Sequence, residues 1–194
     1  CRGRLWSWGN VAIATGLPRI AAAFPQPLPM PEGCRGGLLV ATARRPAFDA
    51  AERARLVSAL RDVRAAAQEA GWEGRIVWRL TAGLEGELGV VNDSRPLAQC
   101  LIDCSAVLTT PSTLLIEAMA AGRACAILHP QDGPIWQEAM GEWRGDAGGH
   151  SQRGLIELLN RLRAPEESDW RRQRRAFERL HAEGSPAARI AEVM

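Results

Sequence analysis

Five short, continuous apolar runs, separated by helical patterns, constrain the fold of this chain more than any other feature of its sequence. None of them shows the strict alternation of apolar and polar residues that is typical of a half-exposed strand. Strands that are apolar throughout are typical of a parallel sheet covered by helices on both faces. The runs are 38–42, 75–80, 88–91, 106–110 and 124–128.

The segments between these runs carry helical periodicity. Residues 53–71 form an amphipathic pattern that ends at Gly71, a residue type that is common just after a last helical turn. The apolar stripe of this pattern consists of Leu56, Leu60, Val63 and Ala67. Further helices are expected over 96–104 and 112–122, whereas the 80s leave room only for a short or irregular crossover. Strand alternating with helix predicts an α/β fold with a doubly wound, mostly parallel sheet.

Composition divides the chain into three parts. We expect residues 1–24 to be the end of a preceding domain or an interdomain segment. Residues 25–37 contain four prolines and three glycines, which is the composition of a semi-rigid linker. Residues 38–194 are expected to form the α/β domain and to end in two helices, at about 152–163 and 166–182.

Several classes of protein do not fit this composition. An apolar content of 46% suits a globular chain, and no run reaches the ~18 to 20 apolar residues that span a bilayer. The formal net charge of +2 gives no reason to expect nucleic acid as a partner. The N-terminus lacks the apolar segment of a signal peptide, and its first residue, Cys1, indicates a piece of a longer protein.

The cysteines predict neither a disulfide framework nor a metal site. There are five of them at irregular spacing, without any Cys-x-x-Cys pair, and the three histidines are scattered. Cys100 and Cys104 are four residues apart in a predicted helix, so we expect both on one face as small buried apolar groups. This pattern fits a reducing compartment, and we expect the protein in the cytoplasm.

Polar side chains follow the predicted strands at their carboxyl ends, the edge where doubly wound sheets bind ligands. They are Thr42, Arg44, Arg45, Arg79, Thr81, Asn92, Asp93, Thr109, Thr110 and His129. Ser112 is the expected N-cap of the helix that follows. A helix N-terminus opened by small hydroxyl residues is suited to an anion, although capping alone would also explain the serine.

Glu117 lies in the middle of a helix that is apolar on nearly all sides. It is not the acid of a capping box, which would lie three residues after Ser112, at Leu115. Because burying an unpaired carboxylate costs several kcal/mol, Glu117 needs an arginine, backbone donors or ligand hydroxyls as partners. One turn beyond a phosphate-binding N-terminus, it is placed to accept two hydroxyls of a ribose. A nucleotide site is therefore predicted, with a structural ion pair as the alternative.

Three segments resemble parts of one enzyme superfamily. Residues 104–128, with an apolar strand, a small-residue turn, a helix carrying Glu-Ala and a glycine before the next strand, resemble the signature segment of GT-B glycosyltransferases and nucleotide-sugar 2-epimerases. Residues 11–20, "VAIATGLPRI", and 184–194, "GSPAARIAEVM", are similar to their interdomain strand and turn and to their last helix. The resemblance covers most of 11–194 and implies a Rossmann-like domain, the C-terminal half of a GT-B architecture.

This resemblance implies that the chain would be the donor-binding domain of a glycosyltransferase of surface-polysaccharide or glycolipid synthesis. Ser112 and Thr113 would meet the diphosphate, Glu117 the ribose, and the 90–97 loop the base. The predicted nucleotide-binding residues are Arg44, Arg79, Asn92, Thr110, Ser112, Thr113 and Glu117. Many relatives carry His-Pro where Thr81 and Ala82 stand here, and their catalytic base usually lies in the first domain, so we assign no catalytic residue and expect the fragment to be inactive.

The expected partners are a nucleotide-sugar donor, as substrate, and the N-terminal domain of the same protein, with no nucleic acid. No cofactor or metal is required, because a helix dipole and guanidinium groups can offset the charge of the leaving diphosphate. A nucleotide-sugar 2-epimerase and a non-catalytic nucleotide-binding or interaction module remain as alternatives. The basic run 171–179 follows acids on one helix, an order that the helix dipole explains; a peripheral contact with anionic lipid is the alternative.

Overall fold

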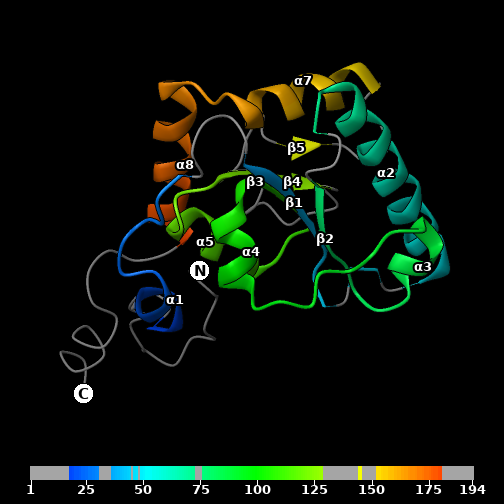
Figure 1. Cartoon of the computed structure of the whole chain (residues 1–194), viewed down its shortest axis with the longest axis horizontal. Helices are drawn as coiled ribbons and strands as arrows, with labels where there is room; N and C mark the ends of the chain where they lie inside the picture. The colour runs from blue at the N-terminus through cyan, green and yellow to red at the C-terminus, as the bar shows by residue number, and fades with distance from the viewer. Residues whose placement is uncertain are drawn as a thin grey trace, which may run out of the picture.

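A computed structural model describes residues 18–30, 36–44, 46–47, 49–72, 76–128, 144–145 and 152–180. Its centre is a parallel sheet with the strand order β2-β1-β3-β4-β5 (Figure 1). The strands are β1 (Gly37–Ala41), β2 (Ile76–Arg79), β3 (Cys104–Thr109), β4 (Ala124–Leu128) and β5 (Arg144–Gly145). The prediction of an α/β fold with a doubly wound, mostly parallel sheet is confirmed.

The helices are α1 (Pro18–Ala23), α2 (Ala50–Glu69), α3 (Leu84–Leu88), α4 (Leu97–Asp103), α5 (Thr113–Ala120), α7 (Gln152–Arg163) and α8 (Glu167–Leu180). The predicted pair of C-terminal helices is confirmed by α7 and α8. The chain runs from β1 to β2 toward one edge of the sheet and from β3 to β4 toward the other. Because crossovers between parallel strands are right-handed, α2 and α5 lie on opposite faces.

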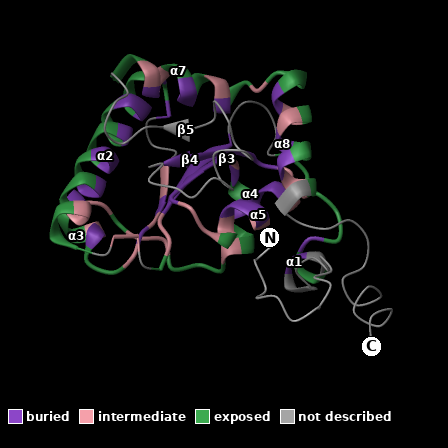
Figure 2. Ribbon diagram, turned by 180° about the vertical axis from the view of Figure 1, so that it is seen from behind, coloured by how far each residue is buried: buried purple, intermediate pink, exposed green. Residues whose placement is uncertain are grey.

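Both faces of the sheet are covered, which explains the continuous apolar runs. Helices α2 and α7 pack together on one face, whereas α4 and α5 pack on the other, with α8 against α5 and β4. Every residue of β1 and β4 is buried. In Figure 2 the purple buried residues gather on the sheet and on the sides of the helices that face it.

Helix α2 follows the predicted pattern. All four residues of its predicted stripe are buried, and Gly71 after its last turn has a φ of 75°, which glycine adopts without strain. The helix begins at Ala50, three residues before the predicted pattern, because the Asp49 carboxylate accepts a 2.7 Å hydrogen bond from the backbone N–H of Glu52.

The predicted strand over 88–91 is wrong. Leu84 and Leu88 are instead the buried residues of α3, a short helix between Gly83 and Gly89, which both have a positive φ. Val91 is 88% exposed. Only Asn92 keeps a strand-like contact, an isolated parallel bridge to Trp78 of β2. The second crossover is short and irregular, as predicted.

The two central cysteines do not share a helix. Cys100 lies on α4, but Cys104 is the first residue of β3, because the chain becomes extended immediately after Asp103. Both are buried free thiols, as is Cys125 on β4. Burial in apolar surroundings raises the pKa of Cys104 to about 12, so this thiol stays protonated.

Several predictions fall outside the described residues. The strand expected in 11–20, apart from the start of α1, and the helix expected over 184–194 belong to this group. So do His129, Arg45 and much of the segment between β4 and α7. Of the predicted linker, residues 25–30, 36 and 37 are described.

Candidate functional site

The strand order reverses between β1 and β3, and the carboxyl ends of these strands form the edge where a doubly wound sheet binds its ligand. Thr42 follows β1 at this edge, and Thr110 follows β3. Thr110 donates its backbone N–H to the carbonyl oxygen of Ala41 at 3.2 Å, which continues the pairing with β1 one residue beyond the end of β3.

Threonine hydroxyls connect three strand ends at this edge. The backbone N–H of Thr81, just beyond β2, donates to Thr42 Oγ1 at 2.8 Å, and the two hydroxyl oxygens lie 3.0 Å apart. The Thr81 hydroxyl donates to the carbonyl oxygen of Ala43 at 2.5 Å, and the N–H of Ala43 donates to Thr110 Oγ1 at 2.6 Å. The strand ends are thereby held in one arrangement before any ligand binds. Thr42 and Thr81 were not among the predicted binding residues. The signal that marks them is a threonine within two residues of the end of each of three strands, β1, β2 and β3.

Two of the predicted binding residues attach the loop after α3 to β2. The Asn92 side-chain amide accepts the N–H of Leu80 at 2.6 Å and donates to the Leu80 carbonyl at 2.7 Å. The Arg79 guanidinium donates to the carbonyl oxygen of Arg95 at 2.6 Å and more weakly to that of Asp93, at 3.4 Å. These contacts give Arg79 and Asn92 a role in shaping the loop; contact of either with a nucleotide stays a prediction.

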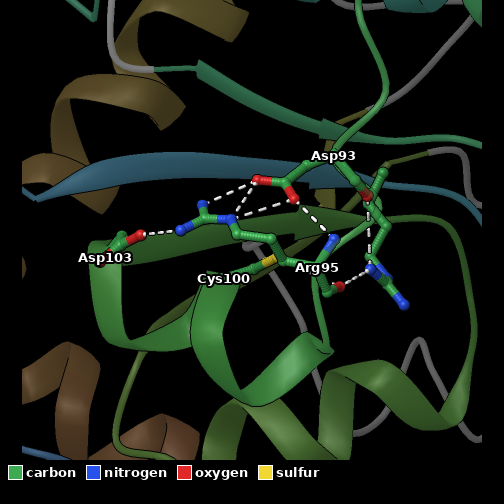
Figure 3. A network of polar contacts seen from close by, with 5 residues as sticks. Asp93, Arg95, Cys100 and Asp103 are labelled. Atoms are coloured by element: carbon green, nitrogen blue, oxygen red, sulfur yellow. Dashed lines mark hydrogen bonds and ion pairs between the residues drawn. The ribbon is translucent and has the colours of Figure 1, made fainter.

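Arg95 completes this loop with a network that sequence reasoning missed. Figure 3 shows its guanidinium between the carboxylates of Asp93, at 2.7 Å, and Asp103, at 2.6 Å. The backbone N–H of Arg95 also donates to Asp93 Oδ1 at 2.9 Å, which is an Asx turn. The side-chain hydrogen bond from Arg95 holds the pKa of Asp93 below its ordinary value of 3.8. The Asn-Asp-Ser-Arg-Pro composition, typical of a turn, could have indicated this geometry.

Ser112 is the N-cap of α5, as predicted, with an extended backbone. Its side chain, however, makes no capping hydrogen bond. The hydroxyl oxygen instead lies 3.4 Å from Thr109 Oγ1 at the end of β3. Capping therefore does not account for this serine, and its hydroxyl lies at the point where the strand order reverses.

The remaining predicted residues are Arg44, in the loop after β1, and two residues of α5, Thr113 and Glu117. Arg44 is exposed two residues beyond Thr42, and Thr113, the first residue of α5, is exposed as well. Glu117 lies one helical turn further and is half-buried rather than buried as expected. It shares the outward stripe of α5 with Leu114 and Ala120, whereas the buried stripe faces the sheet. Because Glu117 is half-buried, the free-energy cost of removing its carboxylate from water is smaller than for a fully buried one.

Comparison with protein-family models gives no match for this chain, and a search among curated proteins gives none either. In the part of the chain that the structure describes, no helix combines the length and apolarity needed to cross a membrane. Within the same residues, no group of three or more His, Cys, Asp or Glu side chains lies close enough to hold a metal ion.

Proposed function

We propose that this chain is the donor-binding domain of a glycosyltransferase that uses a nucleotide-diphosphate sugar, in surface-polysaccharide or glycolipid synthesis. The observation that carries the proposal is the end of α5, where a serine hydroxyl that does not cap the helix lies at the reversal of strand order. A helix N-terminus at this position combines donor N–H groups with a partial positive charge, which suits a diphosphate.

The rim around this helix end supports the same class of ligand. Arg44 is exposed in the loop after β1, at the same carboxyl edge of the sheet, and its guanidinium offers a charge that suits phosphate oxygens. Glu117, one turn along α5, is the proposed acceptor for ribose hydroxyls. The loop fixed by Asn92, Arg79 and Arg95 offers a preformed backbone edge for a base. A preformed rim lowers the ordering cost of binding.

Calorimetry or ligand-observed NMR with uridine and cytidine diphosphate tests this proposal. We expect binding at high micromolar affinity or weaker, because the N-terminal domain of the expected architecture would supply the other side of the cleft. Ser112→Ala should weaken it by roughly tenfold, the effect of one hydrogen bond to a charged group. Ser58→Ala, at an exposed position on α2, is the matched control and should change nothing. Absence of binding to either nucleotide at millimolar concentration would refute the proposal.

A non-catalytic nucleotide-binding module is the second candidate, and Thr81 favours it. Where many relatives of the resembled family carry histidine, the Thr81 hydroxyl instead donates to the Ala43 carbonyl and contacts Thr42. The two candidates differ in the full-length protein: a transferase releases nucleoside diphosphate from a sugar donor in the presence of an acceptor, whereas a module binds the nucleotide and releases nothing.

A further inference from the structure

A groove of about 720 Å³ lies at the end of α5 away from the candidate nucleotide site. One wall is α8 and the other is the segment 24–30, which we call the strap. The floor is formed by Met119, Ala120 and Gly122 at the C-terminal end of α5. Figure 1 shows α8 and α5 next to each other, and the two helices are in contact. The volume falls within the range of ~300–1,000 Å³ that is common for small-molecule sites.

Most of the α8 wall lies beside the face of α8 that packs on the sheet, and Gln173 belongs to both. Asp169, Gln173 and Ala176 are buried. Trp170, Arg174 and Phe177, at helical spacing, line the groove along ~15 Å of helix from Glu167 to Phe177. The groove side of α8 therefore combines two large aromatic side chains with the guanidinium groups of Arg171 and Arg174.

The strap is held in place by a buried arginine. Arg123 is fully buried and donates from Nη2 to the carbonyl oxygen of Pro29 at 2.9 Å and from Nε to that of Leu101 at 2.7 Å. The strap also donates the N–H of Leu28 to the Ala121 carbonyl at 3.1 Å. At the floor, a Cβ on Gly122 would come within 3.0 Å of the Pro27 side chain, so glycine permits this close approach. The groove thus has fixed walls rather than a loose surface.

The charged side chains of the groove leave one cation available. The Arg171 guanidinium is paired with the Glu167 carboxylate at 3.1 Å. Arg174 is exposed and makes no ion pair within the described residues. The rest of the lining is mainly apolar: Phe24, Pro25, Pro27, Met30, Met119, Trp170 and Phe177. An occupant that complements this surface has a long apolar body and one anionic group.

We propose that the groove binds a single-chain anionic lipid, with its alkyl chain along Trp170 and Phe177 and its phosphate or carboxylate on Arg174. This assigns the lipid to a defined pocket instead of to the basic run of α8 as a whole. An acidic helical peptide fits less well, because a helix with its side chains is ~10–12 Å wide and needs a longer trough than ~15 Å to bury several turns. The site lies at the opposite end of α5 from Ser112, so it does not depend on the proposed nucleotide function.

The experiment compares monomeric dodecyl phosphate with dodecyl glucoside, which has the same chain and a neutral head, by calorimetry below the micelle concentration. We expect one molecule of dodecyl phosphate per chain and an affinity at least about tenfold above that of the glucoside, because a charged hydrogen-bond partner is worth roughly this factor. Inorganic phosphate alone should not bind measurably. Arg174→Glu should abolish the preference for the anionic head.

Matched variants distinguish binding of the lipid in the groove from general electrostatic attraction to the basic residues of α8. Arg175→Glu changes charge equally at an exposed neighbour that does not line the groove and should retain the preference. Ala120→Phe should fill the floor and weaken both ligands, whereas Ala98→Phe, at an exposed position on α4, should leave binding unchanged. Equal effects of Arg174→Glu and Arg175→Glu would overturn the proposal. Binding of phosphatidylglycerol vesicles without binding of monomeric dodecyl phosphate would also overturn it, in favour of surface attachment.

Discussion

The hydroxyl of Thr110 accepts a hydrogen bond of 2.6 Å from the backbone N–H of Ala43, and this bond joins the loop after β3 to the loop after β1. The strand order reverses between β1 and β3, so one side chain sets the spacing of the two loops that border the candidate site. Thr110 is 3% exposed, and its oxygen is already engaged with the protein.

Thr110→Val should therefore lower the free energy of unfolding by about 1 to 3 kcal/mol, because the part-buried N–H of Ala43 loses its acceptor while the side-chain volume is kept. Thr110→Ser restores the hydroxyl and should recover most of the loss. Urea denaturation of the three proteins measures this. A valine variant as stable as wild type would show that solvent replaces the threonine hydroxyl.

Glu117→Gln tests the proposed ribose contact. Glutamine keeps the volume and one acceptor, so α5 should remain folded, but the charge-assisted bonds to two hydroxyls are lost. We expect nucleotide affinity to fall by about 1.5 to 3 kcal/mol while the melting temperature changes little. A 2′-deoxy nucleotide should bind wild type more weakly than the ribonucleotide does. The difference in affinity between wild type and the variant should also be smaller for the 2′-deoxy nucleotide.

The opposite pattern would identify Glu117 as a structural acid. If its carboxylate balances a buried guanidinium, removal of the charge should destabilise the domain by about 3 to 5 kcal/mol and leave nucleotide affinity unchanged. Both quantities are therefore measured on the same preparation of the variant.

Asp169 should make stability depend on pH. Its carboxylate is buried at the start of α8, where it accepts a 2.9 Å hydrogen bond from Arg161 Nε of α7 and a 3.0 Å bond from the N–H of Glu166. Burial alone would raise its pKa, but these hydrogen bonds outweigh burial and hold the pKa below its ordinary value of 3.8. A carboxylate with a lowered pKa stabilises the fold above its unfolded pKa and loses that effect as pH falls through the folded value.

Asp169→Asn should accordingly be less stable than wild type at pH 7 by about 1.5 to 3 kcal/mol. The difference should shrink as the pH falls below about 4, where wild type also loses the charge. Glu157→Gln, which removes the exposed ion pair with Arg153 on α7, is the control and should show little change at any pH. Thermal unfolding from pH 2 to pH 7 gives both curves. A difference that does not vary with pH would rule out Asp169 as the titrating group.

The side chain of Gln173, on α8, forms hydrogen bonds with the backbone at the start of β4, as a neighbouring strand would. Its side-chain oxygen accepts the N–H of Cys125 at 2.9 Å, and its amide donates to the Arg123 carbonyl at 2.5 Å. The two described residues of β5 pair further along β4, with Ile127 and Leu128. Gln173→Met keeps the shape but leaves the buried N–H of Cys125 without an acceptor, whereas the Arg123 carbonyl keeps the weak thiol donor of Cys125 at 3.1 Å. We therefore expect the free energy of unfolding to fall by about 1 to 3 kcal/mol, the cost of one unsatisfied buried group. Gln68→Met, at an exposed position on α2, should be neutral in the same urea titration.

Much of the fold follows from local pattern. The apolar runs that became β1, β2, β3 and β4, and the stripe of α2, could be predicted because burial on both faces of a sheet, or on one face of a helix, requires a particular order of apolar residues along the chain. The place of Ser112 at the end of α5 could be predicted for the same reason, since an N-cap is defined by its immediate neighbours.

The contacts that shape the site and the groove depended on the tertiary structure. The Asn92 side chain pairs with the backbone of Leu80, 12 residues away, and the Gln173 side chain pairs with that of Cys125, 48 residues away. Both contacts exist only because folding brings these segments side by side. Arg123 meets the strap across more than 90 residues, and Glu117 is half-buried because its stripe of α5 faces away from the sheet. Hydrophobic periodicity encodes which face of an element is buried, but the partner of a polar side chain is set by which distant segments the packed core places next to it.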